Sequence, residues 1–473
     1  MVRKVLGIAL AFAVAAADAA EPKYVFLFIG DGMSTPQRMV SEEFSRAIGR
    51  GPLAMNQLPY QSMTRTRSAN ALVTDSAAAA TAIACGEKAN NGALGVAPDG
   101  RRLESVAEVA HKKGMKVGIM TTVTIVHATP AAFFAHVPSR GEYYRIALDL
   151  VNSGFEYFAA SGVYNKYDDK TCPAYCGNIF DFGAKRGYTL VRDKAALQAL
   201  KPGVGKVWGV FGEDGLEFAI DHAPDQPSLA DMVAKGIELL SNPNGFFIMA
   251  EGGKVDYSAH ANDAATTARE ILAMDDAVRV ASAFARKHPE ETLIIVTGDH
   301  ETGGMTMGFA GIGYNFNVEL LARQKISSEI FSRHLVAKLQ ENPNLAFEDL
   351  LPVIRENFGL IANRAEAKTE EDRKLVLSKA EIKELRAAFD FDVKFVRSNE
   401  KETRKHDEER RLRFSSTAKR LLDQHAGIGW TSGAHTAMPT MTTAAGVCAD
   451  QFIGYLENVD ISRKLKALLT TSH

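Results

Sequence analysis

A serine that could act as a nucleophile begins an alanine-rich segment, Thr74–Gly86, with the sequence TDSAAAATAIACG. Alanine has the highest helix propensity, either Asp75 or Ser76 suits the N-terminal cap, and Gly86 can end the helix in a left-handed conformation. Ser76 would then lie at the positive end of a short helix, where backbone N–H groups favour an anion such as phosphate. This position suits a nucleophile for a negatively charged substrate, although a serine at a helix start is more often only a cap.

Acidic side chains and histidines follow several apolar segments, in a pattern typical of metal sites. Asp31 lies within Gly-Asp-Gly, and Glu251 precedes two glycines. Asp299 is followed directly by His300. Neighbouring glycines let a backbone approach a metal ion or a phosphate closely. Carboxylates combined with imidazoles suit zinc, whereas ligands that are all oxygen suit magnesium.

Two further candidates have ligand types and spacings that fit a metal. Asp256 and His260 are four residues apart, so one helical turn would present both side chains on the same face. His435 lies in a glycine-flanked loop, SGAHT. A single histidine of this kind is more often a surface residue or a hydrogen-bonded core residue than a ligand.

The segments that must position these residues are short and apolar throughout: residues 24–29, 116–121, 245–250 and 292–297. Such segments are typical of strands buried on both faces, and therefore of a parallel sheet with helices on either side. In that architecture, ligands bind beyond the carboxyl ends of the strands, where three of the four segments are followed by an acid. The sequence predicts an α/β fold with a central, mostly parallel sheet flanked by helices.

Six motifs then resemble the alkaline phosphatase family, in the family's order. They are IGDGM at 29–33, VTDSA at 73–77, ATPAA through AHVPSR at 128–140, EGGKVD at 251–256, TGDH at 297–300 and GAHT at 433–436. The resemblance covers roughly residues 21–140, 215–305 and 428–465. It implies an alkaline phosphatase-like sandwich and a phosphoric monoester hydrolase that works through a phosphoserine on Ser76.

The resemblance also implies the cofactors, two zinc ions and one magnesium ion. The first zinc would be held by Asp256, His260 and His435. The second zinc, facing Ser76, would be held by Asp31, Asp299 and His300. Magnesium would be held by Asp31, Thr129 and Glu251, and Arg140 would grip two phosphate oxygens with its planar fork.

Two positions depart from the best-known bacterial member of the family. His127 stands where that enzyme has an aspartate, and Tyr257 stands where it has a lysine. An imidazole suits magnesium less well than a carboxylate, so we hypothesise that added magnesium is needed for full activity. Alternatively, His127 only packs and hydrogen-bonds around the site. Tyr257 could donate a hydrogen bond toward phosphate through water, but it brings no positive charge.

The composition is that of an enzyme with a large core. The chain has 473 residues, of which 46% are hydrophobic and 24% are charged, and its formal charge of −2 gives no long-range attraction to nucleic acid or to an anionic membrane. Its N-terminus has the pattern of a secretory signal peptide over residues 1–20: two basic residues, an apolar run at 5–16 and ADAA at 17–20. That run is too short to remain as a membrane span. We therefore expect a soluble exported protein, periplasmic or secreted.

The order of the motifs also predicts a domain organisation. Residues 21–310 and 428–473 should form one metallophosphatase domain, because ligands from both parts must meet. Residues 311–427 are charged and helical in pattern and are expected to form a large helical insertion. Its mixed-charge run, residues 400–413, is interpreted as a solvated helix. Animal family members carry an elaboration, the crown, at this place that takes part in their dimer interface, so the resemblance implies a homodimer.

The cysteines are compatible with export. Cys172 and Cys176 could close a small disulfide loop, with two free thiols or a metal clip as alternatives. Cys85 and Cys448 are expected to be buried free thiols.

The sequence is less consistent with two other classes of function. A superfamily relative that cleaves diesters or sulfate esters would use a related metal core, but the sulfatase pattern needs a proline and an arginine that are missing after Ser76. A non-enzymatic module that binds zinc or phosphate would be expected to have lost Ser76, Arg140 or a ligand, and all of them are present. The sequence therefore favours a hydrolase of small phosphate monoesters.

Overall fold

The fold is organised around a ten-stranded sheet. The computed structural model describes residues 21–164, 167–342, 344–397 and 412–470. The strand order is β14 (Gly454–Glu457), β2 (Tyr60–Arg65), β13 (Thr440–Gly446), β8 (Thr292–Gly298), β1 (Tyr24–Gly30), β7 (Phe246–Gly252), β3 (Lys116–Thr121), β4 (Tyr157–Ala160), β6 (Lys206–Val210) and β5 (Tyr188–Val191). Only β13 runs antiparallel to its neighbours within this sheet. The predicted mostly parallel sheet is confirmed.

The four predicted apolar strands are the adjacent central strands β8, β1, β7 and β3. Their parallel register places Ile29 opposite both Glu251 and Thr297. Since parallel strands end at the same edge of a sheet, the residues that follow β1 and β8 lie beside Glu251 at the end of β7. The register alone therefore brings three of the predicted acidic ligands to one place.

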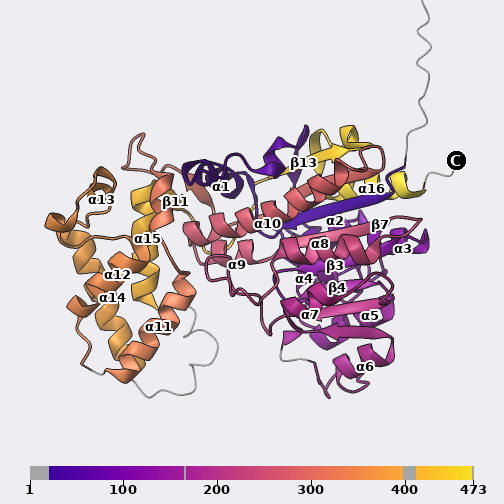
Figure 1. The fold of residues 1–473 in the computed structure, drawn as a ribbon, viewed down its shortest axis with the longest axis horizontal. Helices are drawn as coiled ribbons and strands as arrows, with labels where there is room; N and C mark the ends of the chain where they lie inside the picture. Colours follow the sequence, from indigo (N-terminus) through magenta and orange to yellow (C-terminus); the bar gives the residue numbers. More distant parts are fainter. Residues whose placement is uncertain (1–20, 165–166, 343, 398–411, 471–473) are drawn as a thin grey trace, which may run out of the picture.

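Helices cover both faces of the sheet, because alternate residues of each central strand point to opposite sides (Figure 1). On β1, Phe26 and Phe28 pack with α1 (Thr35–Ala47), α8 (Leu229–Leu240) and α10 (Ala264–Ala285). Val25, Leu27 and Ile29 pack on the other side. Their partners there are α2 (Ser76–Cys85), α3 (Val106–Lys112), α4 (Ala128–Ala131), α5 (Tyr143–Ser153), α6 (Ile179–Lys185) and α16 (Asn458–Thr470).

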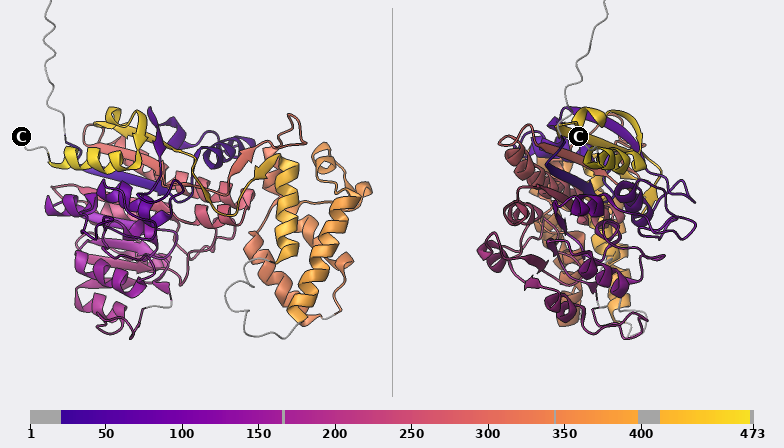
Figure 2. Two further views of the ribbon diagram at one scale, coloured as in Figure 1. Left: turned by 180° about the vertical axis from the view of Figure 1, so that it is seen from behind. Right: turned by 90° about the vertical axis from the view of Figure 1, so that its right-hand side faces the viewer.

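A group of helices lies at the end of the molecule opposite α5 and α6, as Figures 1 and 2 show. These are α11 (Ser328–Glu341), α12 (Phe347–Phe358), α13 (Glu370–Lys374), α14 (Lys379–Arg397) and α15 (Arg413–Ala426). The helical periodicity noted in this part of the sequence is thus observed in α11, α12 and α14. Residues 398–411, which hold most of the mixed-charge run, and residues 1–20 lie outside the described part of the chain.

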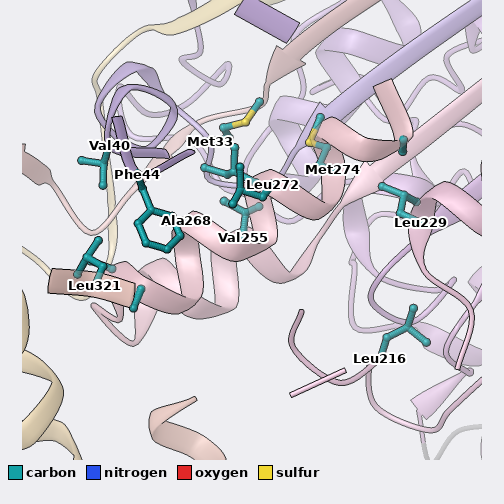
Figure 3. Packing of buried hydrophobic residues seen from close by; sticks show 14 of the residues in the cluster. Met33, Val40, Phe44, Leu216, Leu229, Val255, Ala268, Leu272, Met274 and Leu321 are labelled. Carbon is teal, nitrogen blue, oxygen red and sulfur yellow. The ribbon is translucent and has the colours of Figure 1, made fainter. Parts of the chain in front are cut away.

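One apolar cluster connects this helical group with the sheet. It continues from β1 through α10 and α1 to the short helix η3 (Val318–Arg323) and then to α11, α12, α14 and α15. Figure 3 shows its middle part, where Phe44 of α1, Ala268 of α10 and Leu321 of η3 lie close together. The helical group is therefore packed against the sheet part. The division into domains at residues 311–427 stays a prediction.

The cysteines differ from expectation in two respects. None of the four cysteines, all of which lie in the described part of the chain, is in a disulfide, so the predicted Cys172–Cys176 disulfide is not formed in the structure. Cys176 is held instead by Tyr144, whose hydroxyl lies 3.4 Å from the Cys176 sulfur and accepts a hydrogen bond from its backbone N–H at 3.0 Å. Cys85 is buried, which raises its pKa to about 12. Cys448 is only half-buried, because it lies in the turn after β13.

Within the described residues, no helix is both long and apolar enough to cross a membrane.

Candidate active site

The nucleophile candidate Ser76 is the first residue of α2, and it is not the cap. Asp75 caps the helix, since its carboxylate accepts a hydrogen bond from the Ala78 backbone N–H at 3.0 Å. Gly86 ends the helix with φ of 79°, as the sequence predicts. The Ser76 side chain is therefore available for other contacts, and its Oγ lies 3.2 Å from His300 Nε2. It is 2% exposed, at the positive end of the helix.

The predicted second zinc cluster is assembled at the ends of β1 and β8. His300 Nε2 lies 3.2 Å from Asp31 Oδ1 and 3.3 Å from Asp299 Oδ2. The other oxygen of Asp299 accepts the backbone N–H groups of Gly32 and His300, at 3.0 and 2.9 Å. Asp31 Oδ1 and Asp299 Oδ2 are buried and accept no hydrogen bond from any of the described residues. Buried carboxylate oxygens without donors are costly, so this pair fits a bound cation.

The predicted first zinc cluster combines α9 (Lys254–His260) with a short strand pair. One helical turn separates Asp256 from His260, and His260 Nε2 lies 3.3 Å from Asp256 Oδ2. His435 is delivered from far along the chain by the pairing of β12 (His435–Thr436) with β9 (Glu301–Thr302). Its Nε2 lies 3.6 Å from Asp256 Oδ1 and 3.1 Å from His260 Nε2.

The tautomers of these two histidines suit metal binding. His260 Nδ1 is 2.7 Å from the Gly433 carbonyl, and His435 Nδ1 is 2.9 Å from the Thr74 carbonyl. Because a carbonyl only accepts, each Nδ1 carries a proton, and in the neutral rings each Nε2 presents a lone pair. Two such lone pairs facing each other beside a carboxylate need either a proton or a metal cation between them. The residues present therefore fit zinc.

The predicted third site lies where β7 and α4 meet. Thr129 Oγ1 donates to Asp31 Oδ2 at 3.2 Å. Glu251 is fully buried, and one of its oxygens accepts a hydrogen bond from Thr121 while the other has no donor. His127 Nδ1, also without a partner, lies 3.7 Å from Asp31 Oδ2 and 3.8 Å from Glu251 Oε1. The oxygen atoms gathered here fit a hard cation.

The candidate phosphate ligand Arg140 is held beside the nucleophile. Its Nη1 donates to Asp75 Oδ2 at 3.2 Å, and its Nη2 donates to His127 Nε2 at 3.1 Å. Burial lowers the pKa of Arg140, but the carboxylates of Asp75 and Asp31 outweigh burial and raise it. The guanidinium is thus charged and oriented, which suits recognition of a phosphate dianion.

The site as a whole carries an excess of negative charge. Burial lowers the pKa of His300, but the carboxylates of Asp299 and Asp31 outweigh burial and raise this pKa to about 10. Burial and the charge of Asp31 together raise the pKa of Asp299 well above its usual value. Both shifts result from the concentration of buried negative charge in the site, which bound cations would offset.

Gly32, which follows Asp31, lets the backbone pass close to the side chains of the site. Gly32 has φ of 71°, and a Cβ added there would lie 2.9 Å from Asp256 Oδ1. No side chain larger than hydrogen fits between the first and second clusters at this point. The close approach of the backbone to the site therefore requires a glycine at position 32.

Sequence reasoning missed several residues around the site. Thr302 donates to Asp256 Oδ1 at 2.6 Å, and only its place two residues after His300 hints at this role. Nothing in the sequence pointed to Thr121 beneath Glu251. The Tyr257 hydroxyl, a predicted donor toward phosphate, forms a hydrogen bond with the Tyr164 hydroxyl at 3.0 Å.

Comparison with known proteins gives consistent matches. The family model for alkaline phosphatase matches residues 22–166 and 154–471. Alkaline phosphatase 3 from Bacillus subtilis (strain 168) is 31% identical over 461 residues, which cover 95% of this chain and 89% of the relative. Alkaline phosphatase 4 from the same organism is 30% identical over 477 residues, covering 96% of this chain and 90% of the relative.

Solved structures show the same fold. The cold-active alkaline phosphatase from Shewanella sp. aligns with a TM-score of 0.78 and 27% identity, covering 95% of this chain and all of the other. The enzyme from Thermus thermophilus aligns with a TM-score of 0.75 and 26% identity, covering 95% of this chain and 91% of the other. With these matches over nearly its whole described length, the chain belongs to the alkaline phosphatase family and is a phosphomonoester hydrolase.

Proposed function

We propose that this chain hydrolyses phosphate monoesters through a phosphoserine on Ser76, at a site built for two zinc ions and one magnesium ion. One observation carries the proposal. The Ser76 hydroxyl and the donor-free oxygens of Asp31 and Asp299 all lie within 3.2–3.3 Å of a single atom, His300 Nε2. A hydroxyl in that position faces a cluster of the ligand types that zinc prefers.

Three groups of neighbouring side chains support the ligands proposed for the three metals, and in the third group His127 lies with Asp31 and Glu251. The first zinc would be bound by Asp256, His260 and His435, and the second by Asp31, Asp299 and His300. Magnesium would be bound by Asp31, Thr129 and Glu251. When bound, such ions lower the pKa of a neighbouring hydroxyl and offset the charge that develops on the oxygens of the transferring phosphoryl group.

The side chains of the protein bind the phosphate and place the nucleophile. Arg140 grips two phosphate oxygens with its planar fork, and the N-terminus of α2 adds a favourable partial charge. Ser76 Oγ loses its proton to solvent and bonds to phosphorus as the bond between phosphorus and the leaving oxygen breaks, and the leaving oxygen takes up a proton from solvent. Water next cleaves the phosphoserine, which returns the hydroxyl to Ser76 and releases inorganic phosphate. Positioning and charge supply most of the catalysis in such a loose transition state.

The contact between His127 and Arg140 favours an all-oxygen third site. Arginine has no acceptor, so His127 Nε2 must accept at 3.1 Å and the neutral ring carries its proton on Nδ1. A protonated Nδ1 cannot bind a metal. We therefore propose that His127 orients Arg140, while the carboxylate and hydroxyl oxygens hold magnesium.

Loss of the Arg140 fork is expected to weaken phosphate recognition. Arg140→Lys keeps the charge but loses the paired hydrogen bonds, so kcat/KM for p-nitrophenyl phosphate should fall by about 10- to 100-fold. The inhibition constant of inorganic phosphate should rise in parallel. Arg145→Lys, which changes an exposed arginine paired with Glu142, is the matched control. Unchanged phosphate inhibition in Arg140→Lys would remove this residue from the proposed phosphate site.

The proposed function is tested with two substrates that share a leaving group. The chain, loaded with zinc and magnesium, should hydrolyse p-nitrophenyl phosphate much faster than bis(p-nitrophenyl) phosphate at alkaline pH. A diester carries one negative charge fewer and a second bulky group, so it loses contacts to Arg140. Faster cleavage of the diester would favour the alternative function, a phosphodiesterase of the same superfamily. Metal-loaded protein that cleaves neither ester would favour the zinc- or phosphate-binding module.

We also propose that the protein is exported and acts as a homodimer on small phosphate monoesters. Support for export is the basic and then apolar pattern of residues 1–20. Support for the dimer is the position of the helical insertion, which matches the crown of animal family members. Mass photometry of the purified protein would test the assembly.

A further inference from the structure

A cavity of about 460 Å³ adjoins the site, and part of its lining is aromatic. Arg140, His127, Asp256 and His260 of the site line it. Four aromatic rings also line it: Tyr143, Tyr164, Phe218 and Tyr257. We propose that these rings bind the leaving group and select phosphate monoesters of uncharged aromatic alcohols. This inference rests on the proposed function, because it assumes that the phosphoryl group binds at Arg140.

Three of the rings form a connected series that starts beside the phosphate end. The Tyr257 ring lies 6.0 Å from the His127 ring, in an edge-to-face arrangement. The Tyr257 and Tyr164 hydroxyls are 3.0 Å apart, and the Tyr164 and Tyr143 ring centroids are 4.8 Å apart. An aromatic group joined to a phosphate at Arg140 would meet these rings. Contacts between rings are favourable beyond the area that they bury.

Phe218 is fixed in place by two independent contacts. Lys254 Nζ lies 3.7 Å from the Phe218 ring centroid and 5.4 Å from that of Tyr257, so one ammonium group holds both rings. The next residue, Ala219, donates its backbone N–H to the buried carboxylate of Glu270 at 2.6 Å. A wall that is already ordered loses little entropy when a ligand binds to it.

Backbone strain at Tyr164 is a further indication that this cavity binds a ligand. Its φ of 33° is in the left-handed region, which non-glycine residues with large side chains rarely adopt. The Tyr164 ring contacts that of Tyr143, and its hydroxyl contacts that of Tyr257. Strained residues of this kind concentrate at ligand-binding clamps.

The charges of the cavity favour an uncharged leaving group. Its lining also includes the start of α11, with Ser327, Ser328 and Glu329. Arg140 is the single arginine or lysine among the described residues that line the cavity. A second anionic group on the leaving alcohol would meet the Glu329 carboxylate, which pairs with Arg333 outside the cavity. The nearby Lys254 ammonium already contacts the faces of the Phe218 and Tyr257 rings.

The test uses phosphonates, which bind without being hydrolysed. Calorimetry on the full chain, loaded with zinc and magnesium, would give dissociation constants for phenylphosphonate, methylphosphonate and inorganic phosphate. In the wild type, phenylphosphonate should bind about tenfold more tightly than methylphosphonate. Tyr164→Ala and Phe218→Ala should each reduce this preference by about threefold or more, and Tyr164→Phe should retain most of it. Tyr314→Ala, at a fully exposed tyrosine outside the cavity, is the matched control.

The outcomes separate the inference from the function on which it rests. Equal affinity for the two phosphonates, or a preference unchanged in both alanine variants, would overturn the aromatic site while binding of methylphosphonate still supports a phosphate site. If inorganic phosphate and both phosphonates fail to bind the metal-loaded wild type, the proposed function fails and the inference fails with it. A para-carboxyphenylphosphonate should bind more weakly than phenylphosphonate, and Glu329→Gln should reduce that difference. Tighter binding of the charged compound would contradict selection for uncharged groups.

Discussion

Replacement of Ser76 by alanine is expected to lower kcat for p-nitrophenyl phosphate by about 10⁴-fold or more, because it removes the nucleophile. The fold should not change, since Asp75 and not Ser76 caps α2. Among the described residues, the Ser76 hydroxyl has its hydrogen-bond contact with His300 Nε2, at 3.2 Å. The melting temperature of the metal-loaded variant should therefore stay close to that of the wild type, and inorganic phosphate should still bind.

A matched control for this variant is Ser62→Ala. Ser62 is a buried serine of β2 whose hydroxyl has no hydrogen-bond partner, so its removal should change neither activity nor stability. Both variants are compared by steady-state kinetics at saturating substrate and by thermal unfolding. If the Ser76→Ala variant retains about a tenth or more of the wild-type kcat, a serine nucleophile at this position is excluded.

Removal of metal is expected to abolish the activity and to destabilise the protein. Buried oxygens of Asp31, Asp299 and Glu251 have no hydrogen-bond donors, and two histidine nitrogens face each other at 3.1 Å. Without cations, these groups must be protonated or remain unpaired, and either state costs free energy. Because a metal that binds only the folded state stabilises it by mass action, EDTA should lower the melting temperature by roughly several degrees.

Reconstitution separates the roles of the two metals. Zinc alone should restore part of the activity, and zinc with magnesium should restore it fully, because the third site gathers oxygens from Asp31, Thr129 and Glu251. Activity and melting temperature are measured after EDTA treatment and again after each addition, with metal content measured in the same samples. Full activity with zinc alone would contradict the magnesium requirement, and activity that survives complete removal of zinc would contradict the proposed site.

The fold and much of the site geometry could be predicted from local sequence signals. Four apolar segments predicted the four central strands, because strands buried on both faces need no polar positions. The acids that follow them then had to gather at one sheet edge, which is what the parallel register of β8, β1 and β7 produces. The bounds of α2 were also predictable, since an N-cap, an alanine run and Gly86 mark its start and end.

Other features depend on contacts between distant parts of the chain, which no local pattern encodes. His435 reaches the first cluster through the pairing of β12 with β9, more than a hundred residues away. The antiparallel strand β13 was not predicted, and neither was the contact of Arg140 with His127. The Tyr144 contact that holds Cys176 could not be foreseen from the spacing of the two cysteines. The aromatic cavity is likewise assembled from separate segments around residues 143, 164, 218 and 257.

The most direct test of the central claim is to trap the phosphoryl group on the protein. Wild-type protein loaded with zinc and magnesium is mixed with p-nitrophenyl phosphate, quenched in acid and digested, and its peptides are analysed by mass spectrometry. The proposed mechanism predicts a single phosphoryl group on the peptide that contains Ser76, and none on Ser76→Ala treated in the same way. An active enzyme in which that peptide stays unmodified, or in which another residue carries the phosphoryl group, would contradict the mechanism.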